Sequence, residues 1–411
     1  MYRLLVALLL PLSRLATAQA VLSGTVLDSL THQPLPFASV FLATTTLGAT
    51  TNEQGHFDFA RIPLGSYDLV ASYVGYSLGK QRVVIAAGAA PQQLTFSLLP
   101  SANHLGEVVV RASNPHRADD YRKFKELFLG STSFSKQCSI VNHKDLDVYY
   151  DVVKRELNAT ASNYIQVDNQ ALGYHIKYYG LRFRCQFAQD IISFYGQPVF
   201  EEMTPRNERQ QQIWVANRAT AYYGSLTHFL KSVYDNQVQE AGFLMQQVRL
   251  IPNTHLAHND SMRLALLHKY RYTRLFFTPA EEDSISKWVK APKAFAVLHT
   301  AARPIDSVRR VSTDKAHIFL RFTQELQVAY FGETPDPLYR IGMATIGPPG
   351  APAPRNREVS RLRLLVPEAE IQPNGKLLNP IAVFTSEYMG FEKMGEFLPV
   401  NYVPPASPSH P

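Results

Sequence analysis

Short alternations of apolar and polar residues dominate the first quarter of the chain. At residues 67–73 the alternation has a period of two, which puts one face of a strand on a core. Glycines such as Gly55, Gly65, Gly75 and Gly88 separate these segments, where turns often need positive φ. Strands are predicted at 21–27, 38–43, 56–59, 67–73, 81–85 and 94–98. This spacing predicts a seven-strand-like β-sandwich over residues 21–99.

The same pattern returns after residue 118 and predicts a larger antiparallel, β-rich region at 119–403. Further strands are expected at 146–150, 156–160, 165–167, 174–179, 183–187, 191–195, 318–322, 327–331 and 361–366. The earlier of these have connections of hairpin length, which leave no room for crossover helices. We therefore expect an antiparallel meander.

Helices interrupt this region at two or three places. Apolar residues on one face predict a helix at 118–129, with Gly130 as its C-terminal cap. A second apolar stripe predicts a long helix at 225–240. A capping pattern with Pro279 at the first helical position predicts a short helix at 280–290. The whole chain is thus expected to be mainly β.

The first 20 residues have the pattern of a secretory signal peptide. Arg3 precedes an apolar run at 4–12, and small residues allow cleavage after Ala18 or Ala20. The run is shorter than the roughly 20 residues that a membrane-spanning helix needs. We expect an exported bacterial protein, in the periplasm or associated with the outer membrane of a Gram-negative cell, with no transmembrane segment after cleavage. Residues 100–118 form a junction, and 404–411 are a disordered, proline-rich tail.

Composition narrows the class of partner. The 411 residues suffice for two or three domains, and 45% hydrophobic with 18% charged residues is ordinary for globular proteins. Loss of Arg3 and Arg14 with the leader lowers the formal charge from +7 to +5. The densest basic group is Arg355, Arg357, Arg361 and Arg363. It partly follows a strand alternation, so we interpret it as a solvated face and expect no nucleic-acid binding.

The chain has two cysteines, Cys138 and Cys185. In an oxidising compartment they could form a disulfide. They could equally be small buried apolar residues. The sequence leaves both alternatives open, because the geometry of the strands decides between them.

The residues of 23–76 follow a recognisable order. The matching positions are Gly24, Val26, Asp28, Pro34, Leu35, Ala38, Val40, Thr50, Gly55, Phe57, Val74, Gly75 and Tyr76. With them, residues 21–99 resemble the transthyretin-like, carboxypeptidase-regulatory-like domain. That module follows the catalytic domain of some metallocarboxypeptidases and begins many TonB-dependent receptors. Residues 105–110 resemble the segment that follows the module in receptors, but too few residues remain for a plug and a barrel.

The remainder resembles the exported bacterial proteins called carboxypeptidase-like regulatory-domain-containing proteins. The matching segments are 128–130, 138–140, 171–174, 217–230 and 398–399. That group has no established activity, so the resemblance implies ancestry rather than catalysis. Sandwiches of this kind are also classed with carbohydrate-binding-like folds, but a fold alone does not confer binding.

Candidate metal ligands are few. His104 and Glu107 fit the His-x-x-Glu zinc pattern, with His228 as a distant third ligand. The pattern is short, and it lies in the junction rather than in an α/β catalytic domain, so we interpret it as chance. His255 and His258 are interpreted as surface-loop residues. We assign no catalytic, cofactor-binding or metal-binding residue and expect no cofactor.

Tyrosines gather in the second region and suggest a binding face. They are Tyr149, Tyr150, Tyr174, Tyr178, Tyr179, Tyr195, Tyr222 and Tyr223. Aromatic rings on an open sheet could stack on sugars or pack against a partner. Packing within the core and the hairpins is the interpretation that we favour.

These patterns predict a non-catalytic cell-envelope protein that recognises a protein or a glycan. The alternative is a peptide or glycan hydrolase with its site in the second region. Clustered carboxylates or a His/Glu site in a cleft would favour the hydrolase. A flat aromatic or apolar patch without titratable groups would favour binding.

Overall fold

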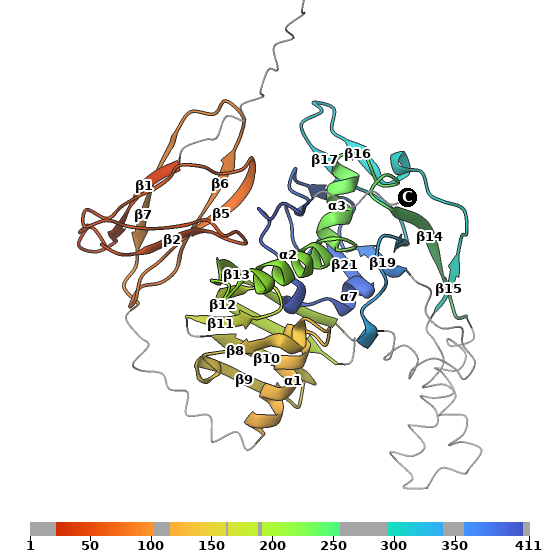
Figure 1. Cartoon of the computed structure of the whole chain (residues 1–411), viewed down its shortest axis with the longest axis horizontal. Coiled ribbons are helices and arrows are strands. Elements are labelled where there is room, and N and C mark those ends of the chain that lie inside the picture. Colours follow the sequence, from red (N-terminus) through yellow and green to blue (C-terminus); the bar gives the residue numbers. More distant parts are fainter. Residues whose placement is uncertain are drawn as a thin grey trace, which may run out of the picture.

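The computed structural model describes residues 22–101, 116–161, 163–187, 191–254, 294–339 and 357–405. It shows the expected mainly β fold, with antiparallel sheets and a few helices. Figure 1 shows three β-rich parts in chain order: a sandwich, a middle sheet, and a third part that contains the C-terminal strands. Each part has its own hydrophobic cluster of buried residues.

The N-terminal part is a sandwich of seven strands, as predicted. One sheet has the order β4-β1-β7 and the other the order β3-β2-β5-β6. The strands are β1 (Leu22–Asp28), β2 (Ser39–Leu42), β3 (Gly48–Thr50), β4 (His56–Phe59), β5 (Gly65–Ser72), β6 (Gly79–Ile85) and β7 (Gln92–Leu98). Six of them correspond to the predicted strands. The short β3 was missed because it is three residues long and largely exposed, so it has no alternation.

Strand β1 packs closely against its neighbours in the sandwich. Every second residue of this strand is buried, from Leu22 to Asp28. Gly24 lies where a Cβ would overlap with the carbonyl oxygen of Leu94 and come within 2.7 Å of the Phe57 ring. A glycine is therefore required at this position by close approach of neighbouring strands.

The middle part is a six-stranded antiparallel sheet with helix α1 (Arg117–Leu129) packed on it. Its strands are β8 (Cys138–Ile140), β9 (Leu146–Asp151), β10 (Glu156–Ala161), β11 (Tyr164–Asn169), β12 (Tyr174–Gln186) and β13 (Ile191–Glu202). Short 3₁₀ turns at Ser135–Gln137 and His143–Asp145 connect its first elements. The α1 helix and its Gly130 cap confirm the prediction.

Two expectations for this sheet were wrong. The strands predicted at 174–179 and 183–187 are the single strand β12, with irregular pairing between Tyr179 and Arg182. The sheet is not a meander either. β12 is long enough to pair with β11 along one half and with β10 along the other, while β13 pairs along both halves. Although β10 and β11 are consecutive in the chain, each therefore pairs with a different half of β12.

The helices after β13 also differ from expectation. Helix α2 (Glu208–Tyr222) was not predicted, because it buries only Trp214, Arg218 and Ala221 and has no apolar stripe. Helix α3 (Leu226–Tyr234) is shorter than the predicted 225–240. Asn236, at φ 61°, adopts the left-handed conformation that commonly ends helices.

The third part combines two sheets. A five-stranded sheet has the order β15-β14-β18-β19-β21, and a three-stranded sheet has the order β16-β17-β20. The strands are β14 (Phe243–Pro252), β15 (Ala294–Leu298), β16 (Arg309–Val311), β17 (Ile318–Leu320), β18 (Glu325–Tyr330), β19 (Glu358–Leu364), β20 (Ala369–Ile371) and β21 (Val383–Glu387). Helix α7 (Tyr388–Phe391) and 3₁₀ turns at Ile305–Ser307 and Met394–Glu396 complete it.

The sandwich docks on the middle sheet through backbone hydrogen bonds and an apolar contact. Thr44 N donates to the Pro198 carbonyl oxygen at 2.6 Å, and Val400 N donates to the Thr44 carbonyl oxygen at 2.8 Å. The Phe41 ring stacks on Tyr179 with centroids 4.8 Å apart. The C-terminal segment therefore helps to join the first and last parts of the chain.

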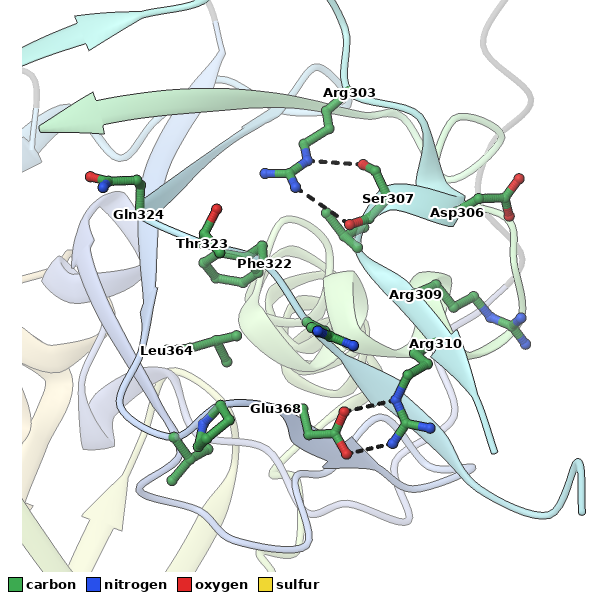
Figure 2. Close-up of a pocket in the computed structure, with 14 residues that line it drawn as sticks. Arg303, Asp306, Ser307, Arg309, Arg310, Phe322, Thr323, Gln324, Leu364 and Glu368 are labelled. Carbon is green, nitrogen blue, oxygen red and sulfur yellow. Dashed lines mark hydrogen bonds and ion pairs between the residues drawn. The ribbon is translucent and has the colours of Figure 1, made fainter. Parts of the chain in front are cut away.

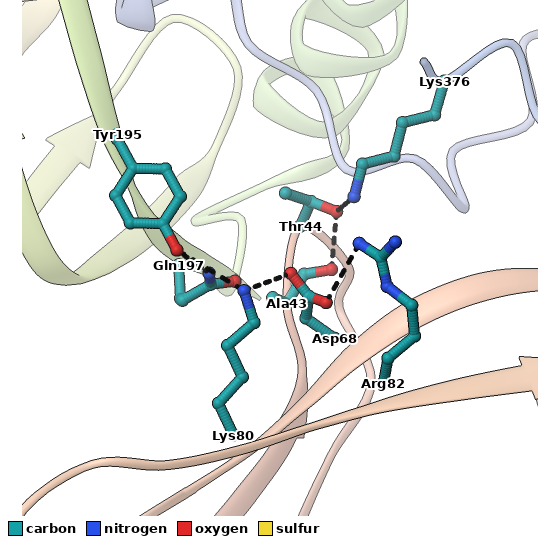
Figure 3. A network of polar contacts seen from close by, with 8 residues as sticks. All are labelled: Ala43, Thr44, Asp68, Lys80, Arg82, Tyr195, Gln197 and Lys376. Carbon is teal, nitrogen blue, oxygen red and sulfur yellow. Dashed lines mark hydrogen bonds and ion pairs between the residues drawn. The ribbon is translucent and has the colours of Figure 1, made fainter. Parts of the chain in front are cut away.

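Polar side chains surround this contact (Figure 3). Asp68 forms a salt bridge with Lys80 at 2.8 Å and a longer one with Arg82 at 3.4 Å. Lys376, from the third part, donates to Thr44 Oγ1 at 3.1 Å. Burial lowers the pKa of Lys376, and the Asp68 charge opposes that shift. One sandwich carboxylate thus lies near three cations from two parts of the chain.

Within the described ranges, no helix is long and apolar enough to cross a membrane. Both cysteines are buried and neither is in a disulfide. Of the two alternatives left open by the sequence, Cys138 and Cys185 therefore fit that of small buried apolar residues. The receptor-like segment at 105–110, the helix predicted at 280–290 and the tail from 406 lie outside the described residues.

Candidate functional site

An open cavity of about 820 Å³ lies in the third part, between the 3₁₀ turn at Ile305–Ser307 with β16, the β17–β18 turn, and the end of β19 with the segment after it. We call it the arginine pocket. Its lining residues are Arg303, Asp306, Ser307, Val308, Arg309, Arg310, Arg321, Phe322, Thr323, Gln324, Leu364, Val366, Pro367 and Glu368. The lining holds four arginines and two carboxylates, which leaves two positive charges in excess. A pocket of this size and charge suits a small anionic ligand.

Two of the four arginines already have partners within the protein. Arg310 forms a two-point ion pair with Glu368, and this pairing lowers the pKa of Glu368. Arg309 donates to the Val233 and Tyr234 carbonyl oxygens at 2.9 and 3.1 Å. These carbonyls belong to the last turn of α3, where cationic groups are favoured. Arg309 and Arg310 therefore shape the pocket.

The other two arginines retain binding capacity. Arg303 uses Nε and Nη2 on Ser307, at 2.9 and 3.4 Å. Its Nη1 is buried and has no hydrogen-bond partner among the described residues. Burial also lowers the pKa of Arg303, which means that its charge is incompletely compensated. Arg321 is exposed. An anion in the pocket could pair with both guanidinium groups.

Figure 2 shows how these groups are arranged. Arg303 lies on one side of the pocket and the Arg310–Glu368 pair on the opposite side. In this view the third nitrogen of Arg303 is directed away from Ser307, on the side where Thr323 and Gln324 lie. A ligand would therefore meet a cationic group and neutral polar groups together.

A second concentration of charge is acidic. Glu333, Glu358, Glu392 and Glu396 act on one another electrostatically, and we call them the glutamate cluster. Glu333 follows β18, Glu358 begins β19, and the other two lie after α7 and at the end of the last 3₁₀ turn. Glu396 also interacts with Thr132, from the segment after α1. The cluster thus lies where the middle and third parts meet.

Burial raises the pKa of every carboxyl in the cluster. It raises the pKa of Glu358 to about 8, and the charge of Glu333 adds to this effect. The pKa values of Glu333 and Glu396 are raised to about 7, again by burial first. The pKa of Glu392 is raised well above its usual range. At neutral pH several of these groups therefore carry protons.

Glu358 is the most enclosed member, with 4% of its surface exposed. Tyr388 hydrogen-bonds to its carboxyl, but Oε2 has no hydrogen-bond partner among the described residues. Gly224, at φ 80°, lies against this carboxyl, and a Cβ there would overlap with Oε2. The backbone between α2 and α3 thus packs directly on the cluster. In the described part of the chain, no group of three or more His, Cys, Asp or Glu residues is arranged to hold a metal ion.

His228 is a core residue in the structure. Its Nδ1 accepts a hydrogen bond from Gly224 N at 3.2 Å. The Phe243 ring lies 4.8 Å from its imidazole, and Tyr330 lies 5.5 Å away. Burial lowers the pKa of His228 to about 4, so it is neutral at physiological pH. The other histidines and the glutamate considered with it, His104, Glu107, His255 and His258, lie outside the described residues.

The tyrosines do not form an open aromatic face. Tyr174, Tyr178 and Tyr179 are buried in the middle sheet. Tyr195 is exposed but accepts a hydrogen bond from Lys80 of the sandwich at 3.4 Å. Tyr150 packs against Phe187 with ring centroids 5.8 Å apart. Core packing, part of the interpretation favoured from the sequence, accounts for Tyr174 and Tyr178, whereas Tyr179 and Tyr195 contact the sandwich.

Neither charged site was anticipated. The arginine pocket draws its cations from three segments, and the only local signal was the adjacent pair Arg309-Arg310. The basic group that was noted lies elsewhere: Arg361 pairs with Glu387 at 2.9 Å, and Arg363 lies over the Phe384 ring at 5.2 Å. In the glutamate cluster, only Glu392 and Glu396 are close in sequence.

Comparisons with solved structures are weak. A chain of a type II cohesin–X-dockerin complex from Acetivibrio cellulolyticus matches at 16% identity and a TM-score of 0.16, covering 20% of this chain and 56% of that chain. This protein thus spans just over half the length of that chain. A Bacteroides uniformis protein provisionally described as carbohydrate-binding matches at 11% identity and a TM-score of 0.16, covering 44% and 79%.

A third solved structure covers more of the chain. It is a Bacteroides fragilis protein of unknown function, at 10% identity and a TM-score of 0.17, covering 90% of this chain and 95% of that chain. Scores this low carry no argument about function. No curated protein matches the sequence. The family model described as CarboxypepD_reg-like domain matches residues 22–110, which confirms the regulatory-like module expected at the N-terminus.

Proposed function

We propose that this chain is an exported cell-envelope protein with a non-catalytic binding role, and that its ligand occupies the arginine pocket. Export rests on the leader pattern of residues 1–20. The observation that carries the binding role is an open cavity whose lining holds two arginines, Arg303 and Arg321, that form no ion pair with another described residue. A bound anion would supply that partner.

The chemistry of the pocket favours recognition over catalysis. An arginine stays protonated throughout the physiological range and so does not serve as a general acid or base. The carboxylate of Glu368 is held in its ion pair with Arg310, which keeps it ionised. Groups with fixed charge bind and orient a ligand without exchanging protons with it.

Binding without turnover is the test. The mature protein is titrated with soluble cell-wall glycan fragments and envelope peptides by isothermal titration calorimetry, and the ligands are recovered and weighed by mass spectrometry. We expect a saturable heat whose affinity Arg303→Gln weakens about tenfold, with the ligand mass unchanged. Arg182→Gln, an exposed arginine on β12, is the matched control. Cleavage of the ligand by the wild type would contradict the non-catalytic role.

The glutamate cluster supports a second candidate, a peptide or glycan hydrolase. Carboxyls whose environments separate their pKa values can divide the roles of general acid and general base. Glu358, with its pKa raised to about 8, would be the protonated partner. If the wild type cleaves a fragment and Glu358→Gln does not, while Arg303→Gln still cleaves it, the hydrolase replaces the binding role.

Export has a separate test. The full sequence is expressed in a Gram-negative host, and the N-terminus of the fractionated protein is sequenced. We expect it to begin at Gln19 or Val21, because cleavage is predicted after Ala18 or Ala20. Recovery of an intact leader in the cytoplasmic fraction would contradict export.

A further inference from the structure

We infer that the ligand of the arginine pocket is a sugar that carries an oxyanion, either a carboxylate or a phosphate. This inference rests on the proposed binding role and specifies its ligand. Such a ligand needs three kinds of contact in one cavity: cations for its oxyanion, neutral polar groups for its hydroxyls, and an apolar surface for its ring.

The cations come first. Arg303 and Arg321 form no ion pair with another described residue; Arg303 is half-buried, and Arg321 is the exposed guanidinium of the same lining. Arginine binds carboxylate and phosphate groups through parallel N–H donors. Two excess positive charges in the lining remain for a ligand to neutralise. A neutral ligand would leave Arg303 uncompensated.

Neutral polar groups lie next to these cations. Thr323 and Gln324 line the pocket and are exposed. Gln324 Oε1 accepts a hydrogen bond from Leu250 N at 3.2 Å, so the Thr323 hydroxyl and the Gln324 amide N–H remain for a ligand. Sugar hydroxyls both donate and accept hydrogen bonds, as do these side chains. Figure 2 shows both on the Arg303 side of the pocket. A small inorganic anion would leave these groups unused.

An apolar surface completes the lining. Leu364 ends β19, and Val366 and Pro367 lie between β19 and β20. The C–H face of a sugar ring can pack on such a surface while its hydroxyls point toward the polar side. The volume of about 820 Å³ lies within the range of small-ligand pockets. An anionic sugar is the class of ligand that uses all three kinds of contact.

Four probes separate the parts of this inference: glucuronic acid, glucose 6-phosphate, glucose and inorganic phosphate. Each is titrated into the mature protein by calorimetry at low salt. We expect both anionic sugars to bind at least about tenfold more tightly than glucose and than phosphate, since a charged hydrogen bond is worth about that factor. Preference between the two anionic sugars identifies the oxyanion. Arg303→Gln and Arg321→Gln should each weaken their binding about tenfold, and Arg182→Gln should not.

The other outcomes overturn specific parts. Equal binding of glucose and glucuronic acid would overturn the anionic requirement but leave a binding role. Equal binding of phosphate and glucose 6-phosphate would overturn the sugar and leave an anion site. If no probe binds more tightly than about 1 mM, the inference is wrong, and the glycan-fragment and peptide titrations above decide the binding role separately.

Discussion

The arginine pocket and the glutamate cluster are both concentrations of charge in the same part of the chain, but they solve the problem of burial differently. The pocket is open, and two of its four arginines are paired or hydrogen-bonded within the fold. The cluster is enclosed and like-charged, so its carboxyls take up protons instead. Charge in the pocket is therefore independent of pH in the physiological range, and charge in the cluster is not.

This difference separates recognition from stability. A guanidinium can offer a fixed charge to a ligand at any physiological pH. Buried carboxyls with raised pKa values couple protonation to the folded state, because the unfolded chain holds its protons less tightly. The first site can be tested by ligand binding and the second by the pH dependence of unfolding.

The largest expected effect is the loss of stability as pH rises. Because the cluster binds protons more tightly in the folded than in the unfolded state, the free energy of unfolding should fall from about pH 6 to about pH 8.5, by roughly 3 kcal/mol. His228 acts in the opposite sense, since its lowered pKa removes stability only as pH falls from about 6.5 toward 4. Urea denaturation from about pH 4 to about pH 8.5 measures both effects. A flat profile between pH 6 and pH 8.5 would contradict the buried cluster.

The next effect isolates one carboxyl. Glu358→Gln keeps the shape of the side chain and removes its charge, so it should stabilise the protein by about 2 kcal/mol at pH 8.5 and by close to zero at pH 5. The control is Glu201→Gln, an exposed carboxylate paired with Lys177, which should change stability by less than about 0.5 kcal/mol. Destabilisation by Glu358→Gln at pH 8.5 would show that its negative charge is needed.

A smaller effect tests the backbone that encloses the cluster. Gly224→Ala should cost about 1 to 2 kcal/mol, from its positive φ and from overlap with the Glu358 carboxyl. Gly180→Ala is the matched control, since it has φ 60° but nothing within 4 Å of an added Cβ. Thermal unfolding compares the two. Equal losses of stability in the two variants would mean that the cost of Gly224→Ala comes only from its positive φ and not from overlap with Glu358.

The smallest effect belongs to the pocket. Arg321→Gln should change the free energy of unfolding by less than about 0.5 kcal/mol, because the residue is exposed. That change should also be the same at pH 6 and pH 8.5. A large or pH-dependent loss would mean that the arginine serves the fold, and the contrast between the two sites would disappear.

The sequence predicted local features well and long-range ones poorly. Six sandwich strands and α1 were found because alternation and apolar spacing are local signals. β12 was divided in two because pairing by several neighbours is not visible along one strand. α2 was missed because its buried positions include the polar Arg218, which donates to the Leu172 carbonyl oxygen at 2.7 Å.

Both charged sites depend on the same kind of long-range placement. Arg303 and Arg321 are brought to one cavity by the 3₁₀ turn at Ile305–Ser307 and by the turn after β17. Glu358 and Glu396 meet only because the C-terminal segment returns between the middle and third parts. Residue type alone could not indicate which arginine would lack an acceptor or which glutamate would be buried.

The most direct test of the contrast is the pH dependence of binding. Glucuronic acid is titrated into the wild-type protein at pH 6 and pH 8.5, with circular dichroism confirming that the protein is folded at both. If the arginine pocket is the binding site, Kd should change by less than about twofold, while the free energy of unfolding falls over the same interval. A Kd that rises about tenfold with pH, and that Glu358→Gln but not Arg303→Gln alters, would place the ligand at the glutamate cluster and contradict the proposed function.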